Sequence, residues 1–298
     1  MAEKTCHAPW LPLENPQEKT TWWVVSGMTG VTVWHFLHHR LTLTPFFSCM
    51  TVASDTFIYI ILEYAGRNSL FDLLAHEQRN SGGPVDGFLA QRLFLHITEG
   101  LAYCHGRFVC HRDLKPENFI METPKDHARY NPDRPWSSDS LKIADFGLAA
   151  TLKAGQRLMA QCGSMPFAAP EVMAAKSYDG FKLDVWSIGV VLLELTCGVS
   201  KMERLMRWPM DGALFADEEK AREIFQRTSN EEKFRNDIVR DFRPDYMRKA
   251  GNESIKNLLN MLTRELLVFD EARRSSITQI EQSPWVVDAR RRAKEWGR

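Results

Sequence analysis

The chain has 298 residues, of which 44% are hydrophobic and 26% are charged, and its 38 basic residues balance 38 acidic ones. This composition is that of a globular protein of one large domain or two lobes, with no net charge to attract nucleic acid. The six cysteines form no CxxC pair and no cluster with histidine, which favours buried structural thiols in a reducing compartment. We therefore expect a location in the cytoplasm or nucleus.

Residues 1–20 are polar and contain three prolines, which predicts a disordered or loosely packed leader. The apolar stretch from Thr21 to Leu37, whose only ionisable side chain is His35, has two interpretations: a short membrane segment, or a buried strand or helix of a small lobe. We favour the buried element, because polar residues dilute the stretch and its length is at or below the roughly 17–25 residues that span a bilayer. No basic region precedes it and no small-residue cleavage pattern follows, so we do not expect a signal peptide.

Two strands are predicted between Phe46 and Tyr64, the second of them in the continuous apolar run IYIILEY. A short helix through LFDLLAHE follows, with Asn68 or Ser69 as its cap. Asp86 caps a longer helix, which ends at Gly106. The apolar stripe of this longer helix consists of Leu89, Leu93, Ile97 and Leu101, while His96 and His105 are interpreted as packing or surface residues.

Two motifs carry the chemistry: HRDLKPEN begins at residue 111, and LKIADFG begins at residue 141. Transfer of a phosphoryl group requires positioned charge, namely a carboxylate at the acceptor hydroxyl, oxygen ligands for Mg²⁺ and a cation near the transferred group. Asp113 supplies the first, Asn118 and Asp145 supply the second, and Lys115 supplies the third. The two motifs therefore indicate phosphoryl transfer.

With these residues, the chain resembles a eukaryotic-type protein kinase over residues 57–286. The blocks HRD, DFG, Ala169-Pro170-Glu171 and DVWSIG, followed by Arg274, occur in the order of that family. LKPEN is the serine/threonine-specific form, and the segments CGSMPFAAPE and YDGFKLDVWSIGV are most similar to the calcium/calmodulin-dependent kinase group. The resemblance implies an α+β, two-lobed kinase fold with a complete, mainly helical C-lobe and an incomplete, β-rich N-lobe.

We accordingly expect four parts: a disordered leader (1–20), a partial N-lobe (21–64), the hinge and C-lobe (65–286) and a basic C-terminal tail (287–298). In the C-lobe we predict a solvent-exposed insertion at residues 122–140 and a helix, buried nearly all round, from Asp184 to Gly198. Between residues 199 and 250, EEKAREIFQRT is the best candidate for a helix. An amphipathic helix through Ile255–Leu262 and a last helix through ITQIEQ, ending near Pro284, follow. The basic cluster at residues 290–294 is either an anionic-surface patch or, as we favour, a solvated helix end.

The resemblance also implies roles for individual residues in catalysis and nucleotide binding. Asp113 orients or deprotonates the acceptor hydroxyl, Lys115 steadies the phosphate, and Asn118 with Asp145 holds Mg²⁺. The implied ATP-binding residues are Leu62 at the back of the adenine pocket, the main chain of Glu63 and Ala65, Ile120, and Asp145. Glu117 is expected to favour a basic residue in the substrate.

A second set of residues has implied structural or regulatory roles. Arg112 is the kind of cation that pairs with a phosphate on the activation segment. Ser164 hydrogen-bonds Asp113 and Lys115, Glu171 forms a buried ion pair with Arg274, and Asp184 accepts backbone N–H groups of the HRD loop. The set is completed by Phe146, which packs on the core residue His111, and by Gly147.

The region upstream of residue 63 lacks three parts that a kinase uses: a glycine-rich turn, a strand lysine and a helix glutamate. Its only glycines are Gly27 and Gly30, which form no GxGxxG, and its only lysines are Lys4 and Lys19 in polar, proline-flanked context. A lost charge-assisted hydrogen bond costs about 1.5–3 kcal/mol and lost preorganised donors cost about 2.7–4 kcal/mol, so turnover falls by about three to five powers of ten.

Two explanations compete for this deficit: a truncated or mis-spliced form of an active kinase, and a pseudokinase that uses the fold as a binding or scaffold module. We favour the first, because Asp113, Lys115, Asn118 and Asp145 are all intact. The implied partners are ATP, Mg²⁺ and a protein substrate with a serine or threonine hydroxyl. We expect a monomer that binds neither nucleic acid nor membrane. Because residues 155–163 contain no serine, threonine or tyrosine, loop phosphorylation is not expected to be the main switch.

Overall fold

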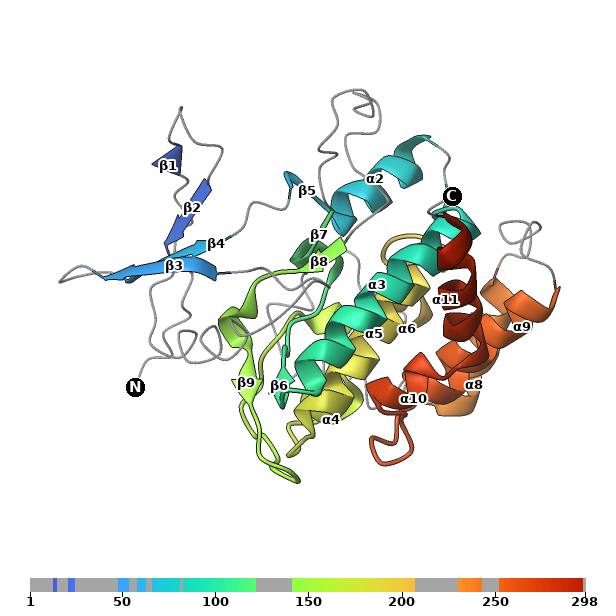
Figure 1. Cartoon of the computed structure of the whole chain (residues 1–298). Coiled ribbons are helices and arrows are strands. Elements are labelled where there is room, and N and C mark those ends of the chain that lie inside the picture. Colours follow the sequence, from blue (N-terminus) through green and yellow to red (C-terminus); the bar gives the residue numbers. More distant parts are fainter. Residues whose placement is uncertain are drawn as a thin grey trace.

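The structure, a computed structural model, describes residues 13–14, 21–24, 48–53, 58–62, 66–80, 83–121, 141–206, 230–242 and 252–296. Figure 1 shows these residues in two parts: a small sheet formed by the N-terminal strands, and a larger body that is mainly helical. This arrangement is the α+β class predicted from the sequence. The predicted insertion at 122–140, the helix predicted in EEKAREIFQRT, and both Glu63 and Ala65 lie outside the described residues.

The N-terminal sheet has four strands in the order β1-β2-β4-β3, and every neighbouring pair is antiparallel. Its strands are β1 (Leu13–Glu14), β2 (Thr21–Val24), β3 (Ser48–Ala53) and β4 (Ile58–Leu62). The run IYIILEY supplies β4, which pairs on both sides, as expected for a continuous apolar run in a central strand. Strand β1 falls within the predicted disordered leader, and β2 opens the apolar stretch that we interpreted as a buried element. No helix in the part of the chain that the structure describes is long and apolar enough to cross a membrane.

Two smaller sheets lie within the helical body. One contains β5 (Asn68–Ser69), β7 (Phe119–Met121) and β8 (Leu141–Ile143), and the other pairs β6 (Val109–Cys110) with β9 (Ala150–Thr151). Strand β7 follows HRDLKPEN directly, and only Ala144 separates β8 from the DFG motif. The pairing of β7 with β8 therefore brings the two motifs together.

The helices of the larger body begin where side chains cap them. The hydroxyl of Ser69 accepts the N–H of Asp72 at the start of α2, and the carboxylate of Asp86 accepts the N–H of Phe88 at the start of α3. Both caps were predicted. The helices are α2 (Leu70–Asn80), α3 (Gly87–His105), α4 (Pro170–Met173), α5 (Gly180–Cys197), α6 (Lys201–Met206), α8 (Glu231–Asp241), α9 (Asn252–Met261), α10 (Ile277–Glu281) and α11 (Pro284–Trp296).

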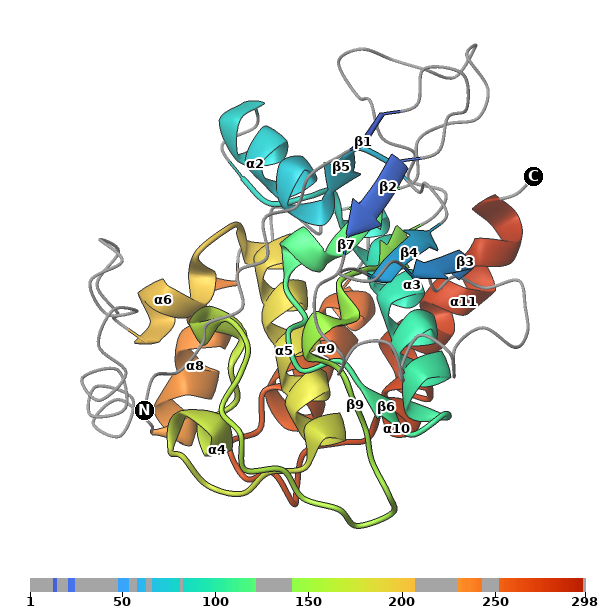
Figure 2. The ribbon, with the colours of Figure 1, turned by 90° about the vertical axis from the view of Figure 1, so that its left-hand side faces the viewer.

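Helix α5 forms the centre of the core, with α3 at its side (Figure 2). It is buried on nearly every face, as predicted, but it begins at Gly180 and not at Asp184. The correction has a simple cause: the carboxylate of Asp179 accepts the N–H of Phe181 at 2.9 Å and caps the helix one turn earlier. The ring of Trp186 on α5 stacks on Phe234 of α8 at 6.4 Å between centroids.

Residues 284–296 form a helix, whereas the sequence predicted a basic tail at residues 287–298. The helix predicted through ITQIEQ is present as α10, but it ends at Glu281, and Pro284 begins α11, which continues to Trp296. The basic cluster lies on α11 and is paired: Arg290 Nε lies 3.3 Å from Glu99 Oε1, and Arg292 Nε lies 2.7 Å from Asp288 Oδ2. These contacts favour the interpretation of the cluster as a helix end.

Candidate active site

The hairpin of β7 and β8 places Asn118 beside Asp145, although the two are far apart in the sequence. Its register pairs Phe119 with Ile143, so that Asn118 and Ala144 flank the hairpin at the same end. The N–H of Ala144 donates to the carbonyl oxygen of Asn118 at 2.8 Å, and Asp145 is the next residue. The two predicted Mg²⁺ ligands are therefore neighbours in space.

A connected cluster surrounds the carboxylate of Asp113. Its Oδ1 accepts the hydroxyl of Ser164 at 3.0 Å, and its Oδ2 lies 3.0 Å from the ammonium of Lys115. Lys115 also donates to Ser164 Oγ at 2.9 Å, so the three side chains form a closed triangle. The amide nitrogen of Asn118 donates to the main-chain oxygen of Asp113 at 2.7 Å. The predicted hydrogen bonds of Ser164 are thus present.

Asp145 has a backbone conformation that most L-amino acids avoid. Its φ is 58° and its ψ is 69°, in the left-handed region, where aspartate and asparagine are tolerated best after glycine. Its Oδ1 accepts the N–H of Gly147 at 3.2 Å, while the side chain as a whole is exposed. A Cβ at Gly147 would lie 3.0 Å from that same oxygen, so glycine leaves room for the carboxylate.

Phe146 is fully buried and packs edge-on against the ring of His111, with 4.8 Å between centroids. Nε2 of His111 donates to the carbonyl of Ala144 at 2.9 Å, and its Nδ1 accepts the N–H of Asp113 at 3.3 Å. Both ring nitrogens are therefore engaged in holding the two motifs together. This arrangement agrees with the expectation that His111 is a core residue and not an acid or base.

Asp184 anchors the HRD loop from the interior. Its fully buried carboxylate accepts the N–H of His111 and the N–H of Arg112, each at 2.8 Å, as predicted. A third partner was missed: Nε2 of His105, at the end of α3, lies 2.9 Å from Oδ2 of Asp184. We had interpreted His105 as a packing or surface residue, and its ring also packs edge-on against Phe181.

Arg112 reaches the start of the activation segment. Its Nε donates to the carbonyl oxygen of Leu148 at 2.6 Å, and its own φ is 70°. Further along the segment, the main chain of Leu158 pairs with Tyr178, whose hydroxyl donates to the carbonyl of Ala160 at 2.7 Å. The start of the segment is therefore anchored to Arg112, and its later part to Tyr178.

The predicted ion pair between Glu171 and Arg274 is present and buried. Nη1 and Nη2 of Arg274 donate to the two carboxylate oxygens at 2.7 and 2.9 Å, a bidentate arrangement. Arg274 also donates to the carbonyls of Val268 and Lys182, and its guanidinium lies over the ring of Trp186. All of these contacts tie the residues after the activation segment to the base of the larger body.

Three carboxylates lie near one another beside the catalytic loop, and the sequence interpretation had singled out only one of them. Glu194 on α5 is 5% exposed, and burial raises its pKa to about 8, with the neighbouring carboxylates of Glu203 and Glu117 raising it further. The N–H of Ser200 donates to Glu194 Oε1 at 3.0 Å. Glu117 is exposed and precedes Asn118 directly. The available sequence signal for Glu194 was its position as a single acidic residue near the end of the apolar helix α5.

The remaining nucleotide-binding candidates are placed only in part. Leu62 ends β4, and Ile120 lies half-buried in β7, where it pairs with Lys142 and Ser69 in the neighbouring strands.

The described residues contain no group of three or more His, Cys, Asp or Glu able to hold a metal by themselves. An amide oxygen and a carboxylate side by side fit Mg²⁺, which takes one or two protein ligands and completes its shell with phosphates and water. Because the nitrogen of the Asn118 amide is bound to Asp113, its oxygen is the atom left for a metal.

Comparison with known proteins identifies the class to which this fold and site belong. A profile described as "Protein kinase domain" matches residues 37–286, so the chain belongs to that family. The match begins upstream of residue 57, where our resemblance started, and it confirms the two-lobed kinase fold.

The relatives are serine/threonine kinases. A probable serine/threonine-protein kinase of Dictyostelium discoideum is 32% identical over 234 residues, which cover 78% of this chain and 22% of the relative. The serine/threonine-protein kinase GIN4 of Saccharomyces cerevisiae is 42% identical over 145 residues (49% and 11%), and SIK1 of Mus musculus is 33% identical over 229 residues (77% and 23%). The chain thus spans less than a quarter of the length of each of these three.

Proposed function

We propose that this chain binds ATP and Mg²⁺ and transfers the γ-phosphate to serine or threonine hydroxyls of a protein substrate. One observation carries the proposal. Asp113, Lys115 and Ser164 form a closed triangle, and Asn118, which donates to the main chain of Asp113, lies beside the loop that presents Asp145. Phosphoryl transfer depends on positioned charge, and these contacts hold the charges in place before any ligand binds.

Each side chain in the triangle has a distinct task. The carboxylate of Asp113, oriented by Ser164 and Lys115, accepts the hydrogen of the substrate hydroxyl and aims its oxygen. Lys115, a partly exposed ammonium between Asp113 and Ser164, offsets the negative charge of the transferred group. Asn118 and Asp145 hold the metal. When bound, ATP with Mg²⁺ supplies the phosphoryl group and neutralises its charge.

The acidic cluster of Glu117, Glu194 and Glu203 supports a preference for basic substrates. Burial raises the pKa of Glu194 most, and the charges of Glu203 and Glu117 add to it; a lysine or arginine of the substrate placed there offsets those two charges. We further propose similarity to the calcium/calmodulin-dependent kinase group, a monomeric state, and a location in the cytoplasm or nucleus.

The second candidate function is a non-catalytic binding module. It is favoured by the absence of a GxGxxG and of a lysine other than Lys4 and Lys19 upstream of residue 63. Because the four catalytic side chains are intact, we favour the other explanation, an impaired form of an active kinase produced by truncation or altered splicing.

A phosphotransfer assay distinguishes these functions. The chain is incubated with radiolabelled ATP, Mg²⁺ and a serine peptide that carries arginines, with Asp145→Asn as the matched control. We expect slow labelling of the peptide by the parent chain and at least a hundredfold less by the variant. Equal background labelling by both, together with a rise in melting temperature on addition of ATP and Mg²⁺, would establish the binding module.

A further inference from the structure

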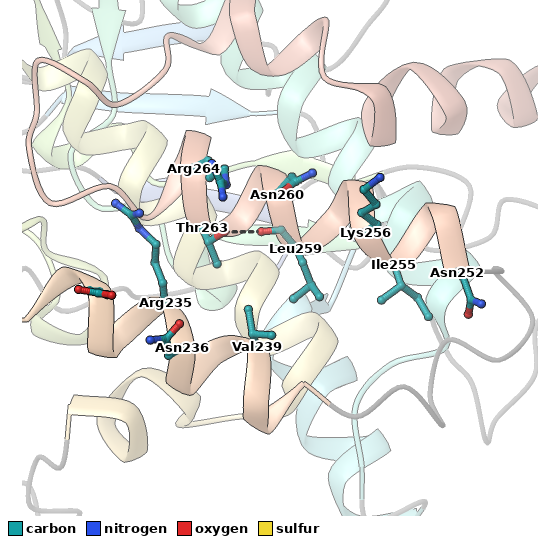
Figure 3. A pocket seen from close by; sticks show the side chains of 11 residues that line it. Arg235, Asn236, Val239, Asn252, Ile255, Lys256, Leu259, Asn260, Thr263 and Arg264 are labelled. Carbon is teal, nitrogen blue, oxygen red and sulfur yellow. Dashed lines mark hydrogen bonds between the residues drawn. The ribbon is translucent and has the colours of Figure 1, made fainter.

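A groove of about 530 Å³ runs between α8 and α9, on residues that the proposed catalytic function does not use (Figure 3). Its lining combines three aliphatic side chains with four uncharged polar ones, namely Asn236, Asn252, Asn260 and Thr263. Leu259 points from α9 toward Val239 on α8, while Ile255 lies further along α9, and Val239 is 51% exposed although it is aliphatic. The volume is within the roughly 300–1,000 Å³ that is usual for binding sites in proteins.

The rim of the groove is positively charged. Arg235, Lys256 and Arg264 line it together with a single acid, Glu232. Among the residues that the structure describes, neither Lys256 nor Arg264 has an ion-pair partner, and both are exposed.

Arg235 differs from the other two cations because it is half-buried. It pairs with Glu231 through Nη2, but its Nε is buried without a hydrogen-bond partner. Because its Nη2 is held by Glu231 and its Nε is buried, Arg235 offers less charge to a ligand than Lys256 and Arg264 do.

We propose that this groove binds an acidic amphipathic segment of a partner protein. One or two aliphatic side chains of the segment cover Val239, Ile255 and Leu259, and its carboxylates pair with Lys256 and Arg264. Charge complementarity selects this occupant, since three aliphatic side chains bordered by cations match aliphatic anchors flanked by acids. The charge is opposite to that of the Glu117, Glu194 and Glu203 cluster, so the same peptide does not suit both places.

The test uses a fluorescein-labelled peptide of 12 residues with two leucines four positions apart among glutamates, and fluorescence anisotropy with the whole chain. We expect saturable binding that weakens about tenfold in the Lys256→Glu/Arg264→Glu double variant and that also weakens as salt rises. Lys294→Glu, a charge reversal at an exposed position of α11 outside the groove, is the matched control and should leave the affinity unchanged.

A second comparison requires no change to the protein. Peptides with serine in place of the leucines, or lysine in place of the glutamates, should bind at least tenfold more weakly than the parent peptide. Absence of saturable binding, equal affinity of the double variant, or equal binding of the lysine peptide would overturn the proposal. The readout is binding alone, so the outcome does not depend on whether the chain transfers phosphate.

Discussion

Phe108 is an exposed aromatic residue in a backbone conformation that suits glycine. Its φ is 60° and its side chain is 54% exposed, whereas Gly106, which ends α3 as predicted, has a φ of −62°. The residue of this turn with the left-handed backbone conformation is therefore Phe108, which has a bulky side chain. That conformation costs a residue with a Cβ about 1–2 kcal/mol. Replacement by glycine recovers only part of this free energy, because glycine has more conformational freedom in the unfolded chain.

We predict that Phe108→Gly raises the free energy of unfolding by up to about 1 kcal/mol. The exposed ring contributes little burial, and the main-chain bonds of Phe108 to His105 and Leu152 remain. Urea unfolding measures the change. Phe71→Gly is the matched control, because Phe71 is also exposed but lies in helix α2, where glycine should destabilise by about 1 kcal/mol. Equal destabilisation by both changes would contradict the prediction.

Glu194 makes stability depend on pH in an unusual direction for a carboxyl group. Its pKa rises from the ordinary 4.5 to about 8, first because of burial and then because of Glu203 and Glu117, while Arg204 and the N–H of Ser200 oppose the rise. Between these pH values the folded chain holds a proton that the unfolded chain has released. The stability that this proton provides is complete below about pH 4.5 and is lost as the pH rises to about 8.

Glu194→Gln should remove this dependence, because glutamine still accepts the N–H of Ser200 and never ionises. We expect the difference in unfolding free energy, variant minus parent, to increase between pH 5 and pH 8 by at most about 1.4 kcal/mol per pH unit. Urea titrations at four pH values measure it. Parallel curves for parent and variant would show that Glu194 titrates normally.

At the scale of elements, the sequence was informative wherever a local signal existed. Ser69 and Asp86 begin helices because their side chains accept N–H groups a few residues ahead, and that relation is visible in the sequence. The two motifs also named the residues that meet at the site. Their meeting depends on the pairing of β7 with β8, which the sequence predicted only through the resemblance.

The errors share a physical cause, namely contacts or boundaries with no periodic signature. The partnership of His105 with Asp184 joins two helices far apart in sequence, so neither neighbourhood indicates it. Pro284 was interpreted as the end of a helix, although proline is equally suited to the first turn, where it begins α11. Helices α6 and α8 are short and charged, and the sequence interpretation placed no helix in either.

The ion pair of Arg274 with Glu171 should be essential to the larger body. Arg274→Ala leaves a carboxylate buried without its bidentate partner, so we expect a loss of about 3–5 kcal/mol in unfolding free energy. Arg273→Ala is the control, since the Arg273 side chain is 62% exposed and only approaches Glu231 at 3.9 Å. It should change stability by less than about 0.5 kcal/mol. Equal melting temperatures for Arg274→Ala and the parent chain would contradict the structural role.

The activation segment should remain ordered without phosphorylation. Arg157 donates to Glu271 at 2.7 Å, and Glu271 also accepts the N–H of Asp179, so that one carboxylate links the segment to the start of α5. We predict that Arg157→Ala speeds amide hydrogen exchange in residues 155–163, whereas phosphatase treatment of the parent chain does not. Stoichiometric phosphate on this segment that raises activity, detected by mass spectrometry, would refute the prediction.

At the scale of the whole molecule, the larger body contains the complete triangle of Asp113, Lys115 and Ser164. The strands that the structure describes in the N-terminal sheet contain no lysine. A kinase places such a lysine on a strand of its small lobe, against the phosphates of ATP. In this sheet, β2 pairs directly with β4, the strand that leads to the predicted hinge. We therefore expect a cation on the face of β2 that meets the phosphates to be the change that raises phosphotransfer most.

Alternate residues of a strand point to opposite faces, and this gives the test its internal control. Trp22→Lys and Val24→Lys place a cation on one face of β2, and Trp23→Lys places it on the other. We expect one face, and not the other, to raise phosphotransfer at least tenfold, because a single charge-assisted contact is worth about 1.5–3 kcal/mol. The rise should vanish when Asp145→Asn is added. If neither face raises the rate, the missing lysine is not what limits the chain, and the binding module becomes the better account of a catalytic loop that is assembled but idle.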